Sequence, residues 1–493
     1  MLDKLKTLGK DALIYGLGGM VSKFIGFFLL PIFTRVFNPS DYGIMDVIAT
    51  MTALAGIVLT AGTETALSFY FFKYREPDEQ RKTVTSTAVY LLGINAVVAV
   101  VVWFLADKIS LLTFDTSNYS VYLRVAILSL PLGSLVGLHL NVLRLQRRPW
   151  AYTSFSISQL LITVLLNIYL VVILRTGIIG VFWTNLITLG LFAIIGIIVN
   201  RSYMSIAALS RRRLAEVLRY GLPLVIGGLS MWSINSIDRF FLVNYSTLDQ
   251  VGLYSVGIRL ASVVGFITWA FRLANAPFQF EISYSKDAPQ IYARTLTYFV
   301  LITSLVCVPL ALFAKPILRL LTREAYLGAN IVVGLAAYSA VAYGMYQIIG
   351  VGLLITKKTL FTSVAISIGA IANVIFLFLL VPPFGMLGAA VSVLLTHAAV
   401  LTILYIGAQR AYPVPYDLKR ISTILVFAGI VIGVRLIINT NHIVVEILSA
   451  SGLFIVYLIM LSLLSVITVN EKRILFDTFK RIITVLRTEH LRV

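Results

Sequence analysis

The sequence predicts an all-α polytopic membrane protein with about 14 transmembrane helices, arranged as two six-helix lobes followed by two further helices. Three observations predict this architecture: a large excess of apolar residues, long apolar segments joined by short loops, and an internal repeat. Hydrophobic residues make up 59% of the 493 residues and charged residues 12%, whereas a soluble globular chain is about half apolar and about a quarter charged. The mean hydropathy of +0.94 therefore indicates that lipid surrounds most of the chain.

The apolar segments have the length of transmembrane helices. A helix needs roughly 20 apolar residues to cross the hydrocarbon layer, and backbone groups in lipid must bond to one another within helices or closed barrels. Long uninterrupted apolar runs indicate helices, because barrel strands would alternate. The connecting loops are too short to hold an extramembrane domain. The expected spans are about 12–34, 43–72, 84–106, 120–143, 151–174, 177–200, 217–243, 251–275, 293–314, 329–355, 359–381, 384–407, 419–438 and 443–467.

The basic residues predict the orientation of these spans. The chain has 40 Lys and Arg against 21 Asp and Glu, but no basic run belongs to a soluble domain, so we expect no nucleic-acid partner. In membrane proteins, basic loops remain on the cytoplasmic side, and their distribution sets the orientation of the helices. With a cytoplasmic N-terminus, the alternate loops place 28 cations inside and 7 outside. We therefore expect a multi-pass protein of the cell (cytoplasmic or inner) membrane with both termini cytoplasmic.

The chain repeats itself at an offset of about 205–210 residues. This offset corresponds to six predicted spans. Because six is an even number, both copies enter the membrane from the same side, and the repeat is parallel. Transporters built in this way bind substrate between the two lobes and alternate the side from which the site is accessible; the other interpretation is a duplication that serves structure alone. The matching features are Tyr15-Gly16 with Tyr220-Gly221, Asp41 and Gly43 with Asp249 and Gly252, Arg147-Arg148 with Lys357-Lys358, and Asn167, Gly177 and Gly180 with Asn373, Gly385 and Gly388.

This repeat predicts four parts of the chain. Residues 1–215 form an N-terminal six-helix lobe and residues 216–410 a C-terminal one. Residues 411–470 add two transmembrane helices. Residues 471–493 form a basic amphipathic cytoplasmic tail, which we expect to lie on the inner leaflet.

Charged residues deep inside the predicted spans are the candidate functional groups. Charge near the bilayer centre costs about 2.5–3.5 kcal/mol on insertion scales, so it needs a functional or structural reason. Lys23 and Glu64 lie within the first two spans, Arg259 lies in the eighth, and Asp238 and Arg239 are adjacent near the outer end of the seventh. On a regular helix, adjacent side chains point in different directions.

These charges admit two interpretations. In the structural one, Lys23 pairs with Glu64 and Asp238 pairs with Arg259. In the functional one, the opening spans of both lobes line one cleft, where the three cations give a positive balance that suits a phosphate or pyrophosphate.

Weaker candidates lie nearer the span ends or are small polar residues that often only join helices. They are Arg124, Arg272, Asn141 and Asn235. The four histidines are scattered and Cys307 is the sole cysteine, so no metal site is predicted. No catalytic constellation is recognisable either, and we expect no enzyme activity.

Several local motifs accompany this architecture. Thr34-Arg35 leads into Asn38-Pro39-Ser40-Asp41-Tyr42-Gly43, the most characteristic run. Ser236-Ile237-Asp238-Arg239-Phe240-Phe241 and Gly385-Met386-Leu387-Gly388-Ala389-Ala390 follow. With these motifs, the whole chain resembles the polysaccharide-transporter branch of the multidrug/oligosaccharidyl-lipid/polysaccharide exporter superfamily, the Wzx-type oligosaccharide flippases.

The resemblance implies a MATE-like fold and a defined activity. It implies a flippase that moves a polyprenyl-pyrophosphate-linked oligosaccharide from the cytoplasmic to the outer leaflet, for lipopolysaccharide or exopolysaccharide synthesis. Cationic residues line the cavity in such proteins, and Lys23, Arg239 and Arg259 match them by position. Relatives couple transport to Na⁺ or H⁺, for which Glu64 or Asp238 are the candidates; no other cofactor is expected. The expected partners are membrane lipids, the lipid-linked glycan and other membrane proteins of polysaccharide assembly.

Other functions remain open from the sequence. A peptidoglycan lipid-precursor flippase would share the fold and differ in the glycan. A drug/cation antiporter usually has twelve spans and an acidic cavity. A membrane glycan polymerase or ligase usually has a large outer loop with catalytic residues, whereas the longest outer loop here spans about 107–119. A membrane scaffold would leave the charges within the spans unexplained.

Overall fold

The computed structural model describes residues 26–438 and 442–463, and the predicted amphipathic tail lies outside them. The first group of helices, here called the N lobe, begins with the helix Gly26–Val36. It continues with α2 (Pro39–Thr60), α3 (Thr63–Lys73), α4 (Pro77–Phe114), α5 (Ser120–Leu145), α6 (Pro149–Asn167) with its π-helical extension Ile168–Ile173, and α7 (Ile178–Val199).

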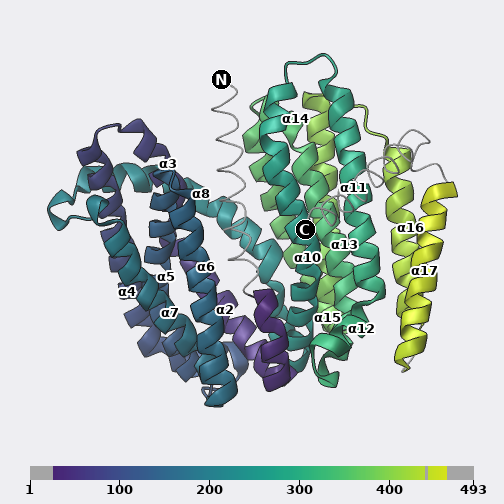
Figure 1. The fold of residues 1–493 in the computed structure, drawn as a ribbon, viewed down its shortest axis with the longest axis horizontal. Helices are drawn as coiled ribbons and strands as arrows, with labels where there is room; N and C mark the ends of the chain where they lie inside the picture. Colours follow the sequence, from purple (N-terminus) through teal and green to yellow (C-terminus); the bar gives the residue numbers. More distant parts are fainter. Residues whose placement is uncertain (1–25, 439–441, 464–493) are drawn as a thin grey trace, which may run out of the picture.

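The second group, here called the C lobe, extends from α8 to α15 (Figure 1). Its helices are α8 (Arg211–Ser236), α9 (Asp238–Tyr245), α10 (Leu248–Ile282), α11 (Ala288–Leu312), α12 (Ala314–Leu321), α13 (Asn330–Ile349), α14 (Val351–Ile355) and α15 (Thr359–Ala411). The chain then adds α16 (Leu418–Ile437) and α17 (Ile443–Leu463). Short 3-10 turns occupy Arg201–Tyr203, Ile206–Ala208 and Glu324–Ala329.

Twelve helices in the described part of the chain are long and apolar enough to cross a membrane. One of them, α15, has 53 residues and would extend about 80 Å, far beyond a hydrocarbon layer of about 30 Å. It turns at Gly385, where φ is 53°, and the Met386 backbone N–H donates to the Gln250 side chain at 3.0 Å. The two predicted spans 359–381 and 384–407 therefore share this element. Together with Gly26–Val36, the end of the predicted first span, these helices agree with the predicted all-α polytopic fold.

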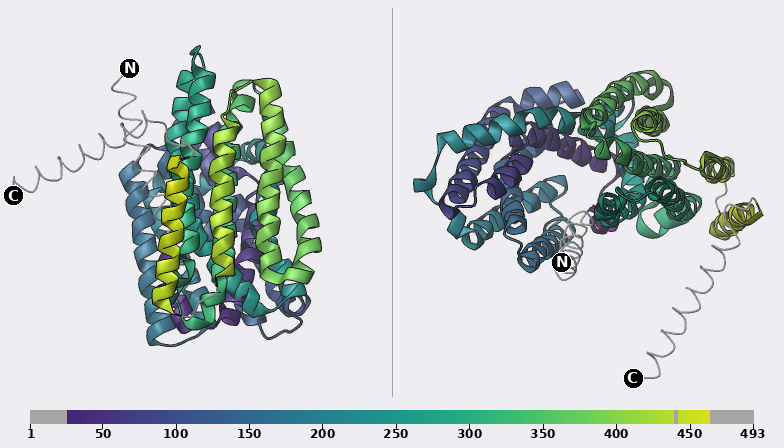
Figure 2. Two further views of the ribbon diagram at one scale, coloured as in Figure 1. Left: turned by 90° about the vertical axis from the view of Figure 1, so that its right-hand side faces the viewer. Right: turned by 90° about the horizontal axis from the view of Figure 1, so that it is seen from above.

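The two lobes diverge toward one face of the molecule and meet at the other (Figures 1 and 2). α8 passes from one lobe to the other. Its first half is joined to α4 by Arg213, whose Nε donates to Glu79 at 2.6 Å. Its second half contacts α15, where Asn373 Nδ2 donates to the Ser233 carbonyl oxygen at 3.1 Å. The predicted boundary at 215/216 thus falls within a helix that touches both lobes.

The lobes meet where α2 and α10 begin. Gly43 and Gly252, which the sequence repeat relates, face each other's helices there. A Cβ atom on Gly252 would overlap the Pro39 carbonyl oxygen, and one on Gly43 would overlap that of Leu248. Only glycine permits this approach of two backbones.

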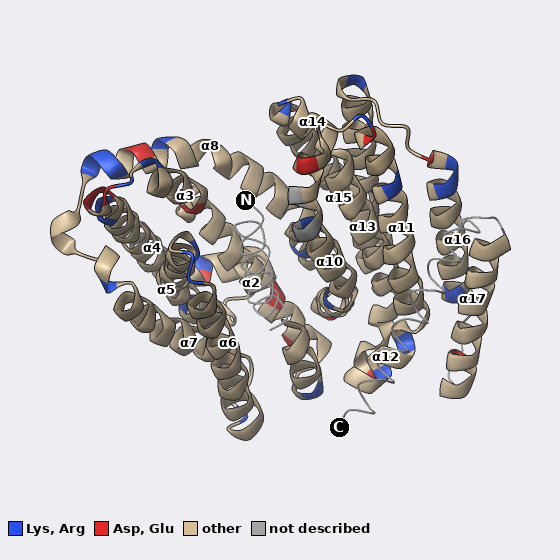
Figure 3. Ribbon diagram, turned by 45° about the horizontal axis from the view of Figure 1, so that its top comes forward, with Lys and Arg blue, Asp and Glu red and all other residues tan. Residues whose placement is uncertain are grey.

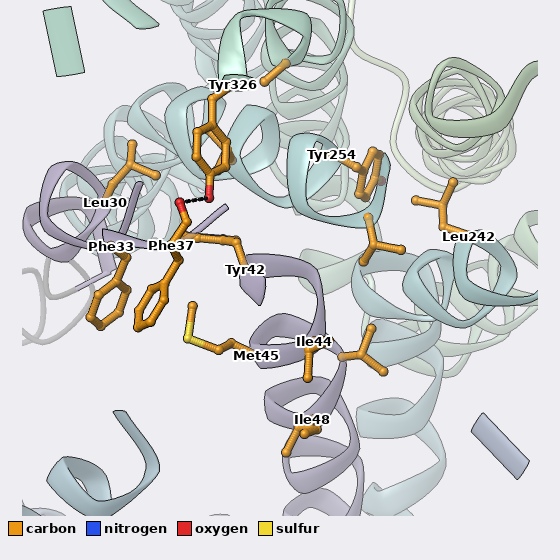
Figure 4. Close-up of a cluster of buried hydrophobic side chains, with 14 of the residues drawn as sticks. Leu30, Phe33, Phe37, Tyr42, Ile44, Met45, Ile48, Leu242, Tyr254 and Tyr326 are labelled. Atoms are coloured by element: carbon orange, nitrogen blue, oxygen red, sulfur yellow. Dashed lines mark hydrogen bonds between the residues drawn. The ribbon is translucent and has the colours of Figure 1, made fainter. Parts of the chain in front are cut away.

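A continuous apolar core surrounds this junction (Figure 4). Within it, the Tyr326 hydroxyl donates to the Phe37 carbonyl oxygen at 3.1 Å. Nearby, Arg35 donates to the Leu320 carbonyl oxygen at 3.2 Å. Both bonds connect the N lobe with the C lobe, so this face is closed.

The characteristic run after the first span is the N-terminus of α2. The Asp41 N–H donates to the Asn38 side chain at 2.9 Å, and the Asn38 N–H donates to the Asp41 carboxylate at 3.4 Å. This reciprocal capping satisfies free N–H groups of the first turn, and Pro39 at the first position is already constrained to helical φ. The motif therefore determines where α2 starts and which residues follow on its inner face.

α16 and α17 lie at the edge of the C lobe (Figure 2). Glu446 of α17 is fully buried. Its carboxylate forms ion pairs with two residues of α12, Lys315 Nζ at 3.0 Å and Arg319 at 3.3 Å. A buried carboxylate needs such partners, so this ion-pair cluster joins α17 to α12, while α16 packs on the C lobe through apolar residues.

Candidate functional site between the two lobes

The candidate site is a network of charged residues where α2, α9 and α10 meet. Asp46 of α2 accepts a hydrogen bond from Arg239 Nε at 3.1 Å. The other side of the same guanidinium binds Asp238, with NH1 to Oδ1 at 2.7 Å. Arg239 and Asp238 are 8% and 1% exposed. Arg239 therefore bridges a carboxylate of the N lobe and one of the C lobe.

A helix interruption explains how Asp238 and Arg239 act together. α8 ends at Ser236 and α9 begins at Asp238. At this junction the Arg239 backbone N–H donates to Asp238 Oδ1 at 2.9 Å, and Arg239 NH1 donates to the Asn235 carbonyl oxygen at 2.6 Å. The hydroxyl of Tyr254 donates to the other oxygen of Asp238.

Two expectations about these charges are corrected by this geometry. Asp238 pairs with Arg239, its neighbour, and not with Arg259. The two adjacent side chains do not diverge, because the guanidinium folds back along the interrupted helix to reach the carboxylate.

Arg259 of α10 is the more accessible cation of the network. Its NH2 lies 3.8 Å from Asp46, and its side chain is 33% exposed. NH1 is 3.4 Å from the Gly26 carbonyl oxygen, and the guanidinium lies 5.9 Å from the centre of the Tyr42 ring. These loose contacts leave donors of Arg259 available to an anion.

The network is close to charge balance among the described residues. Two carboxylates, Asp46 and Asp238, face two guanidinium groups, Arg239 and Arg259. The Ser255 hydroxyl, from the repeat-related turn of α10, adds a hydrogen bond to Asp46 at 2.7 Å. Pairing makes burial of these ions tolerable in a low-dielectric setting. The positive balance predicted from the sequence thus depends on Lys23, which lies outside the described residues.

Two cavities flank the network, one in each lobe. The N-lobe cavity has a volume of about 210 Å³ and contains Asp46 and Arg259 in its wall. The C-lobe cavity has about 260 Å³ and contains Asp238, Asn235 and His397. Each cavity has mostly apolar walls with a few polar side chains, and residues of the charged network lie in the wall of both.

The other predicted residues lie elsewhere. Glu64 is exposed on α3, and its carbonyl oxygen accepts from Asn141 at 3.0 Å. Arg124 binds Asp107 of α4 at 2.6 Å. Arg272 lines a small recess between α10 and α13. The structure therefore brings together Asp238, Arg239, Arg259 and the edge residue Asn235, and leaves the other described candidates outside the network.

Asp46 is the residue that the sequence analysis missed. It lies one turn into the predicted second span, so the rule that singled out Glu64 applied to it equally. Its sequence separation from Arg239 is 193 residues, and only the fold shows that pairing. In the part of the chain that the structure describes, no three or more His, Cys, Asp or Glu residues are grouped so that they could hold a metal ion.

Comparisons with known proteins agree with this architecture. The sequence profile of the family described as "Polysaccharide biosynthesis protein" matches residues 8–282. The Lsg locus putative protein 1 of Haemophilus influenzae is 26% identical over 302 residues, which are 59% of this chain and 71% of that protein. An uncharacterized membrane protein of the same organism is 21% identical over 280 residues, 56% of this chain and 66% of that protein.

Solved structures share the fold. A lipid II flippase MurJ in an inward closed conformation superposes with a TM-score of 0.71 at 14% identity, covering 90% of this chain and 98% of the other. An inward-facing multidrug resistance MATE family transporter of the MOP superfamily gives 0.62 at 14% identity, covering 83% and 98%. At this identity the likeness concerns the fold alone, and it agrees with the predicted MATE-like arrangement.

Proposed function

Because this chain belongs to the polysaccharide biosynthesis protein family, we propose that it is a flippase for a lipid-linked oligosaccharide. The cargo is a glycan on polyprenyl pyrophosphate, carried from the cytoplasmic to the outer leaflet of the cell membrane for surface polysaccharide synthesis. The chain acts as a transporter without catalysis. The observation that carries the proposal is the guanidinium of Arg259, one-third exposed and placed between the lobes in the wall of a cavity.

The pyrophosphate binds by competing with Asp46. Arg259 is 3.8 Å from this carboxylate, a loose ion pair, and the planar guanidinium forms two hydrogen bonds to a phosphate. Arg239 has both of its carboxylate partners at hydrogen-bond distance and remains structural until the lobes move. Anion binding at Arg259 therefore weakens one of the contacts that connect α10 to α2.

Movement of the lobes completes the cycle. The contacts of Arg239 and Ser255 with Asp46 join opposite lobes at the closed face. Access from that face requires these contacts to break, which is the alternation expected of parallel-repeat transporters. Coupling of this step to Na⁺ or H⁺ stays a prediction.

The proposal is tested in a strain that lacks the gene. We expect the strain to accumulate a complete, unpolymerised lipid-linked repeat unit on the cytoplasmic face, measured by lipid extraction and accessibility to an added glycosidase. Arg259→Gln should reproduce the accumulation at normal protein level, whereas Arg124→Gln, whose partner is on α4, should complement. Accumulation of incomplete glycans would indicate an enzyme, and accumulation of a peptidoglycan precursor would indicate the other cargo; either result overturns the proposal.

A further inference from the structure

The wall of the N-lobe cavity includes residues whose buried polar atoms lack hydrogen-bond partners. The cavity is lined by Tyr42, Thr163 and Asn167, among others. Tyr42 and Asn167 are each 2% exposed. Within the described residues, neither Tyr42 Oη nor Asn167 Oδ1 has a hydrogen-bond partner. An unpaired buried polar group is destabilising, and a ligand with a donor or acceptor at this wall would supply the missing partner.

The repeat provides an internal comparison for Asn167. Its counterpart in the C lobe, Asn373, is equally buried, but Asn373 Oδ1 accepts from Thr396 at 3.0 Å and Nδ2 donates to the Ser233 carbonyl oxygen at 3.1 Å. Asn167 uses only Nδ2, toward the Thr163 carbonyl oxygen at 2.8 Å. The helix also changes to π geometry directly after Asn167, a local irregularity that is frequent at functional sites. The same side chain is thus satisfied in one lobe and left unpaired in the other.

The remaining walls define the chemistry of the ligand. Phe33, Phe182 and Leu29 supply apolar surface, and Asn185 adds a second amide. Arg259 and Asp46 lie in the same wall and offset each other's charge, which favours a neutral group, while the unpaired hydroxyl and amide oxygen disfavour a hydrocarbon tail. A neutral ring that carries hydroxyl or amide groups on its edge and C–H groups on its faces fits these walls, since aromatic faces pack against C–H groups.

We propose that this cavity holds the sugar attached directly to the pyrophosphate, with the pyrophosphate on Arg259. The inference rests on the proposed function. Tyr42 donates to a sugar hydroxyl, and Asn167 Oδ1 accepts from a hydroxyl or an acetamido N–H. The volume of about 210 Å³ is many times the space that one water needs and suits a single ring; because the cavity is not enclosed, the further sugars of a longer glycan extend out of it.

The experiment measures binding to the full chain in lipid nanodiscs. The probes are undecaprenyl pyrophosphate alone and the same lipid bearing one glucose, galactose, N-acetylglucosamine or N-acetylgalactosamine. We expect one glycosylated probe to bind at least tenfold more tightly than the bare lipid. Tyr42→Phe, which keeps the ring, and Asn167→Ala should each weaken that probe about five- to tenfold and leave the bare lipid unchanged.

Two controls separate the outcomes. Arg259→Gln should weaken bare and glycosylated lipids by the same factor, and Asn373→Ala, the repeat-related partnered residue, should not alter the preference for the sugar. If no sugar improves binding, or if the Tyr42 and Asn167 variants weaken all probes equally, the sugar site is wrong while the flippase stands. If the wild type binds none of the probes, the proposed function itself fails.

Discussion

The carboxylate of Asp46 accepts hydrogen bonds from Arg239 and Ser255, two residues of the opposite lobe. It also faces Arg259 at 3.8 Å. One acid therefore offsets positive charge on two arginines, of which Arg239 also pairs with Asp238. The same acid occupies the position at which a phosphate would approach Arg259, so it stabilises the empty protein and opposes binding.

Asp46→Asn tests both effects. The variant should lose about 2 kcal/mol of stability, because a hydrogen bond to a charged group is removed while Arg239 keeps Asp238. Its affinity for bare undecaprenyl pyrophosphate should rise about tenfold, equivalent to about 1.4 kcal/mol. Thermal unfolding in detergent and nanodisc binding measure the two quantities.

The matched control is Asp107→Asn, which removes a carboxylate of α4 that pairs with Arg124 of α5. This surface-type pair should contribute at most about 1 kcal/mol, with no effect on binding. An Asp46→Asn protein that binds pyrophosphate no better than the wild type would show that Asp46 does not compete with the cargo.

The candidate site was only partly predictable from sequence. Asp238, Arg239 and Arg259 were identified because a charged side chain within an apolar transmembrane segment is energetically unfavourable whichever side of the helix it occupies. Which charges pair depends on contacts between helices and on the interruption at Ile237, and a periodic helix pattern contains neither. The unpaired state of Asn167, compared with Asn373, depends on the exact approach of Thr396, so it appears only in three dimensions.

At the scale of elements, α2 and α10 pack closely because each has a glycine, and therefore no side chain, at the point of contact. Gly43 and Gly252 allow each helix to approach the other's carbonyl oxygens, those of Leu248 and Pro39. The cap at Asn38 determines the start of α2 and hence the height at which Gly43 and Asp46 reach α10. The contact thus positions the charged network as well as closing the face.

Gly252→Ala should disrupt this contact. The added methyl overlaps backbone and not a flexible side chain, so the two helices must separate, at a cost of about 1–3 kcal/mol. Gly93→Ala on α4 is the matched control, because its Cβ has nothing within 4 Å and alanine favours a helix by about 1 kcal/mol. Unfolding temperatures of both variants in detergent provide the comparison; equal values would refute the close approach.

At the scale of the whole molecule, basic loops gather on the face toward which the lobes diverge (Figure 3). The positive-inside rule predicts that this face is cytoplasmic. The space between the lobes would then open to the cytoplasmic leaflet, from which the lipid-linked sugar is proposed to enter the protein.

Cysteine labelling tests this orientation directly. The sole cysteine, Cys307, is 1% exposed, so the native chain should give little background with a membrane-impermeant maleimide. Ser117→Cys, between α4 and α5, should be labelled from outside in intact cells. Lys358→Cys, between α14 and α15, should be labelled only after permeabilisation. The opposite pattern would invert the topology, and the transport direction with it.

The architecture was more predictable than the site. Hydropathy and loop length identify the helices, since each span must satisfy its own backbone in lipid. The repeat offset indicated two lobes because six spans return the chain to the same side. The path of α8 across both lobes escaped this reasoning, since its contacts with Glu79 and with Asn373 are equally remote in sequence.

The closed face has a property that bears on how such proteins diversify. Several of its contacts involve main-chain oxygens: those of Phe37 and Leu320 accept hydrogen bonds, and those of Pro39 and Leu248 lie against Gly252 and Gly43. Substitution of an acceptor's side chain leaves its carbonyl in place, so the closure tolerates sequence drift at these positions. The proposed sugar cavity, in contrast, depends on side chains such as Tyr42 and Asn167. If the chain is the proposed flippase, selection for a new glycan can remodel this pocket while the main-chain contacts of the closed face stay in place.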